Sequence, residues 1–168
     1  IDAESGFTGN DAALLAGERE TGVTIQKMVK ELDAGDILAQ ESTPILSEET
    51  AHELRPRLIS MGAKLLVETL PAFARGEVTP VVQDPSLATR SGKLKKEDGQ
   101  LDLDAPAQVN WNKYRAYADT IGTYFMENGK RMKITKASLT DGKFIIERII
   151  PEGKREMVYT RSRQVEKS

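Results

Sequence analysis

Residues 20–45, ETGVTIQKMVKELDAGDILAQESTPI, contain two apolar segments separated by a polar turn. The first segment, TGVTIQKMV at 21–29, has the β-branched composition of a strand, and we expect Val23, Ile25 and Met28 to point inward. The second segment, ILAQESTPI at 37–45, is also predicted to be a strand. Because a glycine-containing turn joins them, we expect a hairpin-like unit or the edge of a larger sheet.

The turn between these strands carries two carboxylates, Asp33 and Asp36, on either side of Gly35 (residues 33–36, the acid turn). An aspartate before a glycine commonly stabilises a turn by accepting a hydrogen bond from its own backbone, and this role accounts for one carboxylate. The alternative is that one carboxylate at the strand end orients a histidine or a water molecule. The residues alone leave both interpretations open.

A long amphipathic helix is predicted next, over roughly residues 48–74, with Ser47 as its N-cap. Gly76 is expected to end it, because glycine is favoured just after a helix. Pro56 lies inside the pattern and is expected to kink the helix or delay its start. The apolar residues at helical spacing are Leu54, Leu58, Met61, Leu65, Leu66, Leu70 and Phe73.

The stretch after this helix is rich in Pro, Ser, Gly and Lys and lacks periodicity, as linkers do. We therefore predict a first domain at 1–78, a linker at 79–95 and a second domain at 96–168. Residues 1–88 carry 7 Lys and Arg against 15 Asp and Glu, whereas residues 89–168 carry 17 against 11. An acidic half followed by a basic half indicates two units with different partners.

The second half is predicted to be one helix followed by a β-meander. Residues 106–119, PAQVNWNKYRAYAD, place Val109, Tyr114 and Tyr117 on one apolar stripe, with Trp111 near it. The dipeptides Asn128-Gly129 and Asp141-Gly142 suit the positive φ angles of two-residue hairpin turns, so two successive hairpins are predicted. A small meander with one helix indicates a small β-barrel of OB-like type.

The composition restricts the classes of function. The 168 residues contain no cysteine, which excludes disulfides and thiolate metal sites and fits a cytoplasmic protein, and we expect no metal. No apolar run approaches the roughly 20 residues that span a bilayer, so no membrane partner is expected. The single histidine, His52, lies on the predicted long helix, outside any catalytic motif.

Six segments follow one another in a characteristic order and at close spacing. They are LAGERETGVTIQKM (15–28), LDAGDILAQESTPI (32–45), TAHELRPRLISMGAKLLVETL (50–70), VQDPSLATRSGKLKKEDGQLDLDAPA (82–107), GTYFMENGKRMKITKASL (122–139) and PEGKREM (151–157). Together these segments resemble the methionyl-tRNA formyltransferases. The resemblance covers nearly all of residues 12–157, and it implies an α/β, Rossmann-like partial formyltransferase segment followed by the OB-like domain.

The resemblance implies transfer of a formyl group from 10-formyltetrahydrofolate to the amino group of methionyl initiator tRNA. That reaction passes through a tetrahedral intermediate, and the family uses an Asn, a His and an Asp for it. The Asp of the family's Leu-Asp-x-Gly-Asp turn corresponds to Asp33, which would hold the histidine in its charged form. Asp36 is expected to hold the turn.

Two departures limit what the resemblance implies. The family's Asn-x-His motif and the nearby Ser-Leu-Leu-Pro loop are not present in this sequence, and YADTIG at 117–122 replaces the family's Pro-Trp-Pro-Gly run. We therefore expect the C-terminal portion of a formyltransferase, or a truncated relative, that is inactive alone. Half a sheet would leave a strand edge exposed, so we also expect dimerisation through that edge or marginal stability.

Basic residues in the linker and the meander are the expected tRNA contacts, because the resemblance assigns phosphate binding to these parts. The alternatives are a related formyltransferase that acts on a nucleotide-sugar amine, and a tRNA-binding module that has lost catalysis. The expected tRNA-binding residues are Arg90, Lys93, Lys95, Lys96, Lys130, Arg131 and Lys133.

Overall fold

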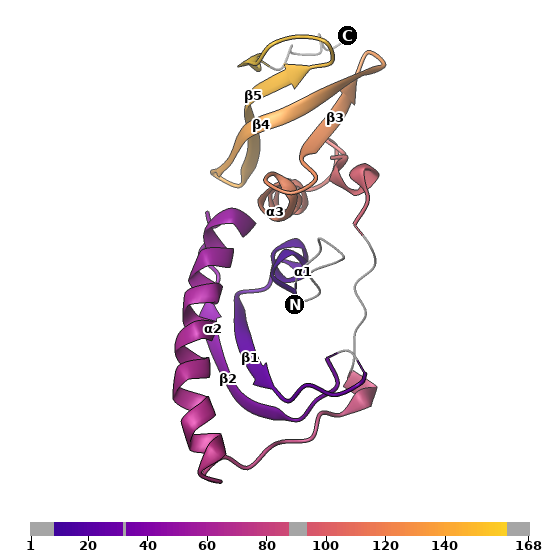
Figure 1. Cartoon of the computed structure of the whole chain (residues 1–168). Helices are drawn as coiled ribbons and strands as arrows, with labels where there is room; N and C mark the ends of the chain where they lie inside the picture. Colours follow the sequence, from indigo (N-terminus) through magenta and orange to yellow (C-terminus); the bar gives the residue numbers. More distant parts are fainter. Residues whose placement is uncertain (1–8, 32, 88–93, 161–168) are drawn as a thin grey trace. The chain divides into compact units, whose positions relative to one another are not determined.

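The chain divides between Lys93 and Leu94 into two units, each with its own antiparallel sheet. The computed structural model describes residues 9–31, 33–87 and 94–160 (Figure 1). The three-part division with a linker at 79–95 stays a prediction, although Val81 within that range already exchanges two backbone hydrogen bonds with Ile37.

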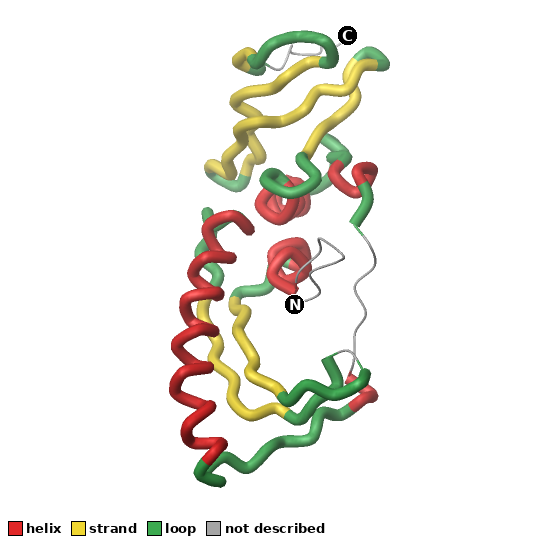
Figure 2. The backbone as a smooth tube through the Cα atoms, in the orientation of Figure 1, coloured by secondary structure: helices red, strands yellow, loops and turns green. Residues whose placement is uncertain are grey.

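The first unit is built on a pair of antiparallel strands, β1 and β2, in which Val23 lies opposite Glu41. The long helix α2 runs alongside both strands (Figures 1 and 2). The elements of this unit are α1 (Gly9–Ala16), β1 (Glu20–Gln26), β2 (Ile37–Pro44), α2 (Ala51–Ala74) and the short 3₁₀ helix η1 (Pro85–Leu87).

Helix α2 begins later than predicted, because its cap is Thr50 and not Ser47. The backbone N–H and the hydroxyl of Thr50 both donate to the Glu53 carboxylate, at 2.9 and 3.0 Å. This is half of the reciprocal arrangement expected of a Thr-x-x-Glu sequence, which Ser47 does not offer. The C-terminal end is as predicted, since Gly76 has φ of 75° and its N–H donates to the carbonyl of Phe73.

The inward placement of Met28 was wrong, since its side chain is 99% exposed. The pairing of β1 with β2 becomes irregular at Gln26, where the strand ends. Residues after Gln26 therefore lie beyond the paired strands, and strand alternation no longer directs their side chains.

Ion pairs fix α2 to the rest of the first unit. The Arg55 guanidinium lies 3.4 Å from the carboxylate of Asp11, a fully buried residue of α1. Arg57 donates twice to the Glu49 carboxylate, at 2.7 and 3.0 Å, and also donates to the carbonyl of Pro44. These contacts hold the first half of α2 against the end of β2.

The second unit is a four-stranded meander in the order β3-β4-β5-β6, with α3 packed on it (Figure 2). Both predicted hairpin turns are confirmed: Asn128 and Gly129 have φ of 50° and 74°, and Asp141 and Gly142 have φ of 51° and 69°. The elements are η2 (Lys96–Gly99), α3 (Ala107–Tyr117), β3 (Thr123–Glu127), β4 (Lys130–Thr140), β5 (Lys143–Pro151) and β6 (Met157–Val158).

Among the described residues, the sheet of the second unit is not closed into a barrel, so the predicted OB-like barrel was wrong. Strand β6 is only two residues long, and the outer edge of β3 meets Gln100 in an isolated bridge. Four strands of such unequal length leave the two edges unpaired with each other. The core lies between α3 and one face of the sheet, and its buried members are Leu101, Trp111, Tyr114, Phe125, Met132, Ile134, Ala137 and Ile149.

Val109 does not belong to the apolar stripe of α3, because its side chain is 52% exposed. The buried face carries Trp111, Tyr114 and Tyr117 at intervals of three residues. Val109 precedes Trp111 by two positions, which places it on nearly the opposite side of a helix.

Candidate functional site

The acid turn presents the Asp33 carboxylate to solvent in a defined orientation. Asp33 has φ of 54°, a left-handed conformation that Asp and Asn adopt more readily than most residues. The Gln26 side-chain amide donates to Asp33 Oδ1 at 3.1 Å, and the Asp33 side chain remains exposed. A carboxylate in this state can accept further hydrogen bonds from a bound group.

Gln83 connects the acid turn to the chain that follows α2. Its Nε2 lies 2.8 Å from the carbonyl oxygen of Asp33, 2.6 Å from that of Gly35 and 3.0 Å from Gln26 Oε1. One side-chain amide thus holds two carbonyls of the turn and also orients the glutamine that donates to Asp33. Neither glutamine was predicted to be a site residue, since neither stands in a recognisable pattern and Gln83 falls in the predicted linker.

Gly35 is required by the path of the backbone. A Cβ at this position would lie 1.7 Å from the carbonyl oxygen of Lys27, which is far inside van der Waals contact. The backbone N–H of Lys27 donates to the carbonyl of Asp36 at 3.0 Å, so the two ends of the connection meet here. The turn can therefore close only because this residue has no side chain.

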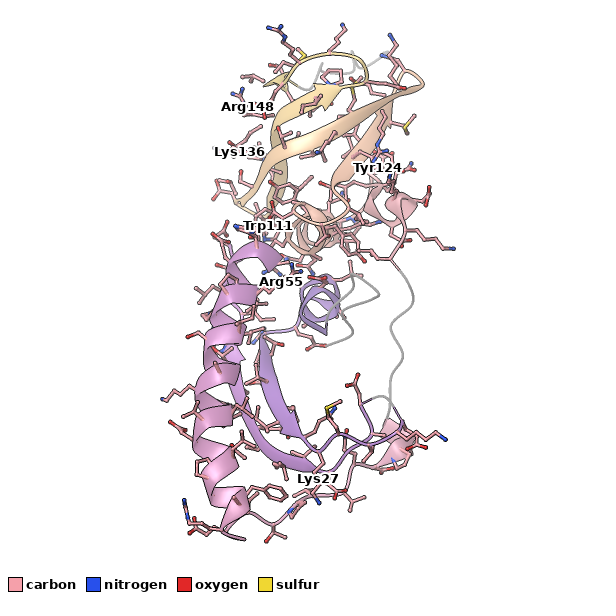
Figure 3. The ribbon with its side chains drawn as sticks, in the orientation of Figure 1. Lys27, Arg55, Trp111, Tyr124, Lys136 and Arg148 are labelled. Atoms are coloured by element: carbon pink, nitrogen blue, oxygen red, sulfur yellow. The ribbon has the colours of Figure 1, made fainter. Side chains whose placement is uncertain are left out.

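The Asp36 carboxylate pairs with the Lys27 ammonium at 3.0 Å, with both side chains about one-third exposed. Figure 3 labels Lys27, whose ammonium also lies 5.8 Å from the ring centre of Phe73 on α2. The two acids of the turn thus differ in state: Asp36 is neutralised within the unit, whereas Asp33 is held only by a neutral amide. Asp36 therefore has a structural role, whereas the Asp33 carboxylate is available to a bound group.

Three further predictions concern the single histidine, metal binding and membrane spans. His52 is exposed on α2, and none of the contacts among the described residues joins it to the acid turn. No group of three or more His, Cys, Asp or Glu side chains in the described part of the chain is arranged to hold a metal ion. None of the described helices is both long enough and apolar enough to cross a membrane.

Five of the predicted tRNA-binding residues lie in the second unit. Arg90 and Lys93 fall outside the described residues. Lys95 and Lys96 are exposed at the start of η2, and Lys130 and Lys133 are exposed on β4.

Arg131, the remaining member of the predicted set, is half-buried, with its guanidinium 3.7 Å from the ring centre of Tyr124. Arg131 and Lys133 share a face of β4, whereas the alternate residues Met132 and Ile134 point into the core. The structure therefore brings these two cations together beside β3.

Comparison with known proteins matches both units. Residues 5–70 match the formyl transferase family, and residues 93–159 match the family of formyl transferase C-terminal domains. Over 146 residues the chain is 37% identical to the methionyl-tRNA formyltransferase of Streptococcus gordonii, covering 87% of this chain and 47% of that protein. Over 125 residues it is 43% identical to that of Lactobacillus johnsonii, covering 74% of this chain and 40% of that protein.

The chain therefore spans less than half the length of these curated relatives. Its fold resembles the crystal structure of the N-formyltransferase from Helicobacter canadensis in complex with folinic acid and dTDP-3-aminofucose. The TM-score is 0.66 at 21% identity, over 79% of this chain and 49% of that one. At this identity the likeness concerns the fold alone.

Proposed function

The chain belongs to the formyltransferase family, and from this we propose that it is the C-terminal part of a cytoplasmic enzyme that formylates methionyl initiator tRNA. The formyl donor is 10-formyltetrahydrofolate. The observation that carries the proposal is the identity to methionyl-tRNA formyltransferases, which covers 87% of this chain in one relative. It includes both the acid turn and the basic second unit, the parts that the reaction and the tRNA would use.

The proposed reaction is acyl transfer to an amine. The amino nitrogen of the methionyl group attacks the formyl carbon, a new C–N bond forms, and the bond from that carbon to the folate nitrogen then breaks. The amine loses a proton and the folate nitrogen gains one, while hydrogen-bond donors stabilise the intermediate oxyanion.

In this scheme Asp33 is the charge partner of a histidine that is supplied from outside this sequence. A carboxylate beside a histidine favours the protonated imidazole and fixes its orientation. The exposed Asp33 carboxylate supports this role, since Gln26, its side-chain partner among the described residues, is a neutral donor that leaves the negative charge in place. Asp36, which already pairs with Lys27, does not meet the same requirement.

The second unit and the residues before it would hold the tRNA through its phosphates. Lys and Arg contacts to phosphate give affinity that is largely independent of sequence and falls steeply with salt. The proposed contacts are Arg90, Lys93, Lys95, Lys96, Lys130, Arg131 and Lys133.

The test is to express this chain joined to whatever sequence its gene encodes directly upstream, and to measure transfer of a labelled formyl group to methionyl initiator tRNA. Asp33→Asn is expected to lower the rate by about 10²–10⁴, as for loss of a general acid–base partner, without changing tRNA affinity. Asparagine keeps the left-handed backbone and the oxygen that accepts from Gln26. Asp36→Asn, in the same turn, is the matched control and should leave the rate within a few-fold of the parent.

Each outcome selects a function. An upstream sequence without Asn-x-His, together with tRNA binding but no formyl transfer, would identify a non-catalytic tRNA-binding module. Transfer to a nucleotide-sugar amine in preference to the tRNA would identify a sugar-modifying formyltransferase. The isolated 168-residue chain is expected to be inactive in either assay.

We also propose that this chain dimerises through the outer edge of β1. Among the described residues, β1 pairs only with β2, so one row of its backbone groups has no strand partner. Light scattering coupled to size exclusion should show a dimer, and Thr24→Pro, which removes a backbone donor from the strand and is incompatible with a paired edge, should weaken it. A monodisperse monomer that melts cooperatively would contradict this proposal.

A further inference from the structure

The cations of the second unit fall into two groups that differ in their partners. Lys136 and Arg148 each pair with a carboxylate, at 2.7 Å to Glu147 and 2.8 Å to Glu156. In contrast, no carboxylate among the described residues lies within ion-pair distance of the side-chain nitrogens of Lys113, Arg131 or Lys133, although the Arg131 backbone N–H donates to the Glu152 carboxylate at 3.5 Å.

The two groups are also separated in space. Figure 3 shows Lys136 and Arg148 together on one side of the second unit and Tyr124, which contacts Arg131, on the other side. The ion pairs of Lys136 and Arg148 therefore lie on a different side of the second unit from Tyr124 and Arg131.

Lys113 and Arg131 are both connected to one residue, Gln100, which forms the isolated bridge to Tyr124. The Lys113 ammonium, on α3, donates to the Gln100 carbonyl at 2.7 Å. The Tyr124 hydroxyl lies 3.4 Å from Gln100 Oε1, and the Arg131 guanidinium covers the Tyr124 ring. Lys113 from α3 thus contacts Gln100 directly. Arg131 from β4 covers the ring of Tyr124, whose hydroxyl lies near the Gln100 side chain.

Lys133 is placed near this surface by a close backbone contact between Gly99 and Gly122. Gly99 packs so closely on the start of β3 that a Cβ there would lie 2.1 Å from the carbonyl oxygen of Gly122. The Lys133 side chain passes over Gly122, with its Cε 3.5 Å from where a Cβ would be. The close approach of the two glycines brings η2 against β3 and places Lys133 beside the Gln100 segment.

We propose that Lys113, Arg131 and Lys133 form a single phosphate-binding surface for an RNA backbone, arranged by Gln100 and Tyr124. The proposal rests on the proposed function and extends it, because it adds Lys113 from α3 and assigns Tyr124 the part of a positioning residue. Below, these three cations are called the Gln100 surface.

The chemistry of each group fits phosphate. A guanidinium that lies flat on an aromatic ring keeps its N–H edge free for two parallel bonds to a phosphate, and the stacking limits its rotamers before the ligand arrives. The Lys113 ammonium uses one of its three donors on the Gln100 carbonyl and retains two. With no carboxylate to displace, the surface can bind an anion without breaking an ion pair.

The test is binding of the full 168-residue chain to methionyl initiator tRNA between about 50 and 200 mM salt, where phosphate contacts lose most of their affinity. Lys113→Gln, Arg131→Gln and Lys133→Gln should each weaken binding and reduce the slope of log K against log salt by about 1. Lys143→Gln is the matched control, since Lys143 is exposed and unpaired among the described residues but lies at the far end of β4 and β5. It should leave both quantities unchanged.

The positioning role of Tyr124 has its own readout. Tyr124→Leu removes the ring under Arg131 but no charge, so affinity should fall while the salt slope stays near that of the parent chain. Tyr124→Phe keeps the ring and should restore binding. Fluorescence of Trp111, the only tryptophan, reports whether each variant keeps the core of the second unit.

The outcomes separate this proposal from the proposed function. Normal binding by Lys113→Gln alongside weakened binding by Arg131→Gln would overturn the three-residue surface and leave tRNA binding by β4 intact. Equal binding by Tyr124→Leu and the parent chain would overturn the positioning role. Loss of binding by Lys143→Gln as well, or no binding by the parent chain, would overturn the surface altogether, whereas formyl transfer with the Asp33→Asn effect would still support the enzyme.

Discussion

The acid turn of the first unit and the two tight turns of the second connect antiparallel strands by different means. At 128–129 and 141–142, two adjacent residues with positive φ reverse the chain, and nothing lies within 4 Å of a Cβ built on Gly129 or Gly142. The acid turn instead needs a glycine wedged against Lys27 and a side chain 50 residues away, that of Gln83. Turns of the first kind are specified locally, and a turn of the second kind is specified by tertiary contacts.

The largest effect is expected from Gly35→Ala. Its Cβ would lie 1.7 Å from a backbone oxygen, which no side-chain rotation can relieve, so the turn must open. We expect a loss of about 3 kcal/mol in unfolding free energy, at the upper end for overpacking. Hydrogen exchange of the amides in β1 and β2, measured by mass spectrometry, should accelerate more than exchange in β4 and β5.

Gly62→Ala in α2 is the control for this change. A Cβ there would lie 3.7 Å from Val23 Cγ1, which is ordinary contact, and alanine favours a helix by about 0.5–1 kcal/mol over glycine. This variant should therefore be as stable as the parent chain or slightly more so. Equal destabilisation by both variants would mean that the packing at Gly35 is not what distinguishes the acid turn.

The next largest effect is expected from Gln83→Glu, which keeps the size of the side chain and replaces its donor with an acceptor. The carbonyls of Asp33 and Gly35 would lose their bonds and face a carboxylate, at a cost of about 2 kcal/mol. Gln40→Glu makes the same change at a residue that donates only to Thr24 across the strands, and should cost at most about 1 kcal/mol. Thermal unfolding followed by circular dichroism compares them, and similar losses would count against a long-range role for Gln83.

The same distinction explains what the sequence could and could not predict. The tight turns, the end of α2 at Gly76 and the strand segments follow from short-range rules, and each was predicted from adjacent residues. Gln83 and Lys113 were missed because their partners are a carbonyl of a turn and a carbonyl of a bridge, which leave no mark in sequence.

Two of the wrong predictions, for Met28 and for the barrel, also concern features that are decided by contacts distant in sequence. Met28 was placed inward because the apolar composition extended the predicted strand to Val29, although strand pairing and not composition decides where a strand ends. The barrel was expected from a small meander with one helix, yet closure depends on the length of the edge strands, and β6 has two residues.

A smaller effect is expected from Gly142→Ala in the second unit. The side chain would enter open space, so the only cost is the left-handed conformation, about 1–2 kcal/mol for a residue other than Gly, Asn or Asp. Asp141→Asn should be neutral, because asparagine suits the same region. Unfolding followed by Trp111 fluorescence tests this pair, and a loss as large as that of Gly35→Ala would erase the contrast between the two kinds of turn.

The smallest effect is expected at the start of α2, a helix end that is also specified by residues close in sequence. Hydrogen bonds from the Thr50 backbone and hydroxyl hold the pKa of Glu53 below its usual range. A lowered pKa stabilises the fold above the unfolded-state value, and this contribution is lost as the pH falls through the folded-state pKa.

Glu53→Gln isolates this contribution, because the amide oxygen can accept the same bonds without titrating. At neutral pH the variant should be less stable than the parent chain by under about 1 kcal/mol, since the group is exposed to solvent. The difference should shrink as the pH is lowered, while the shared titration of the other carboxylates cancels. A difference that stays constant with pH would mean that the carboxylate charge adds nothing to the cap, and that geometry alone sets this end of the helix.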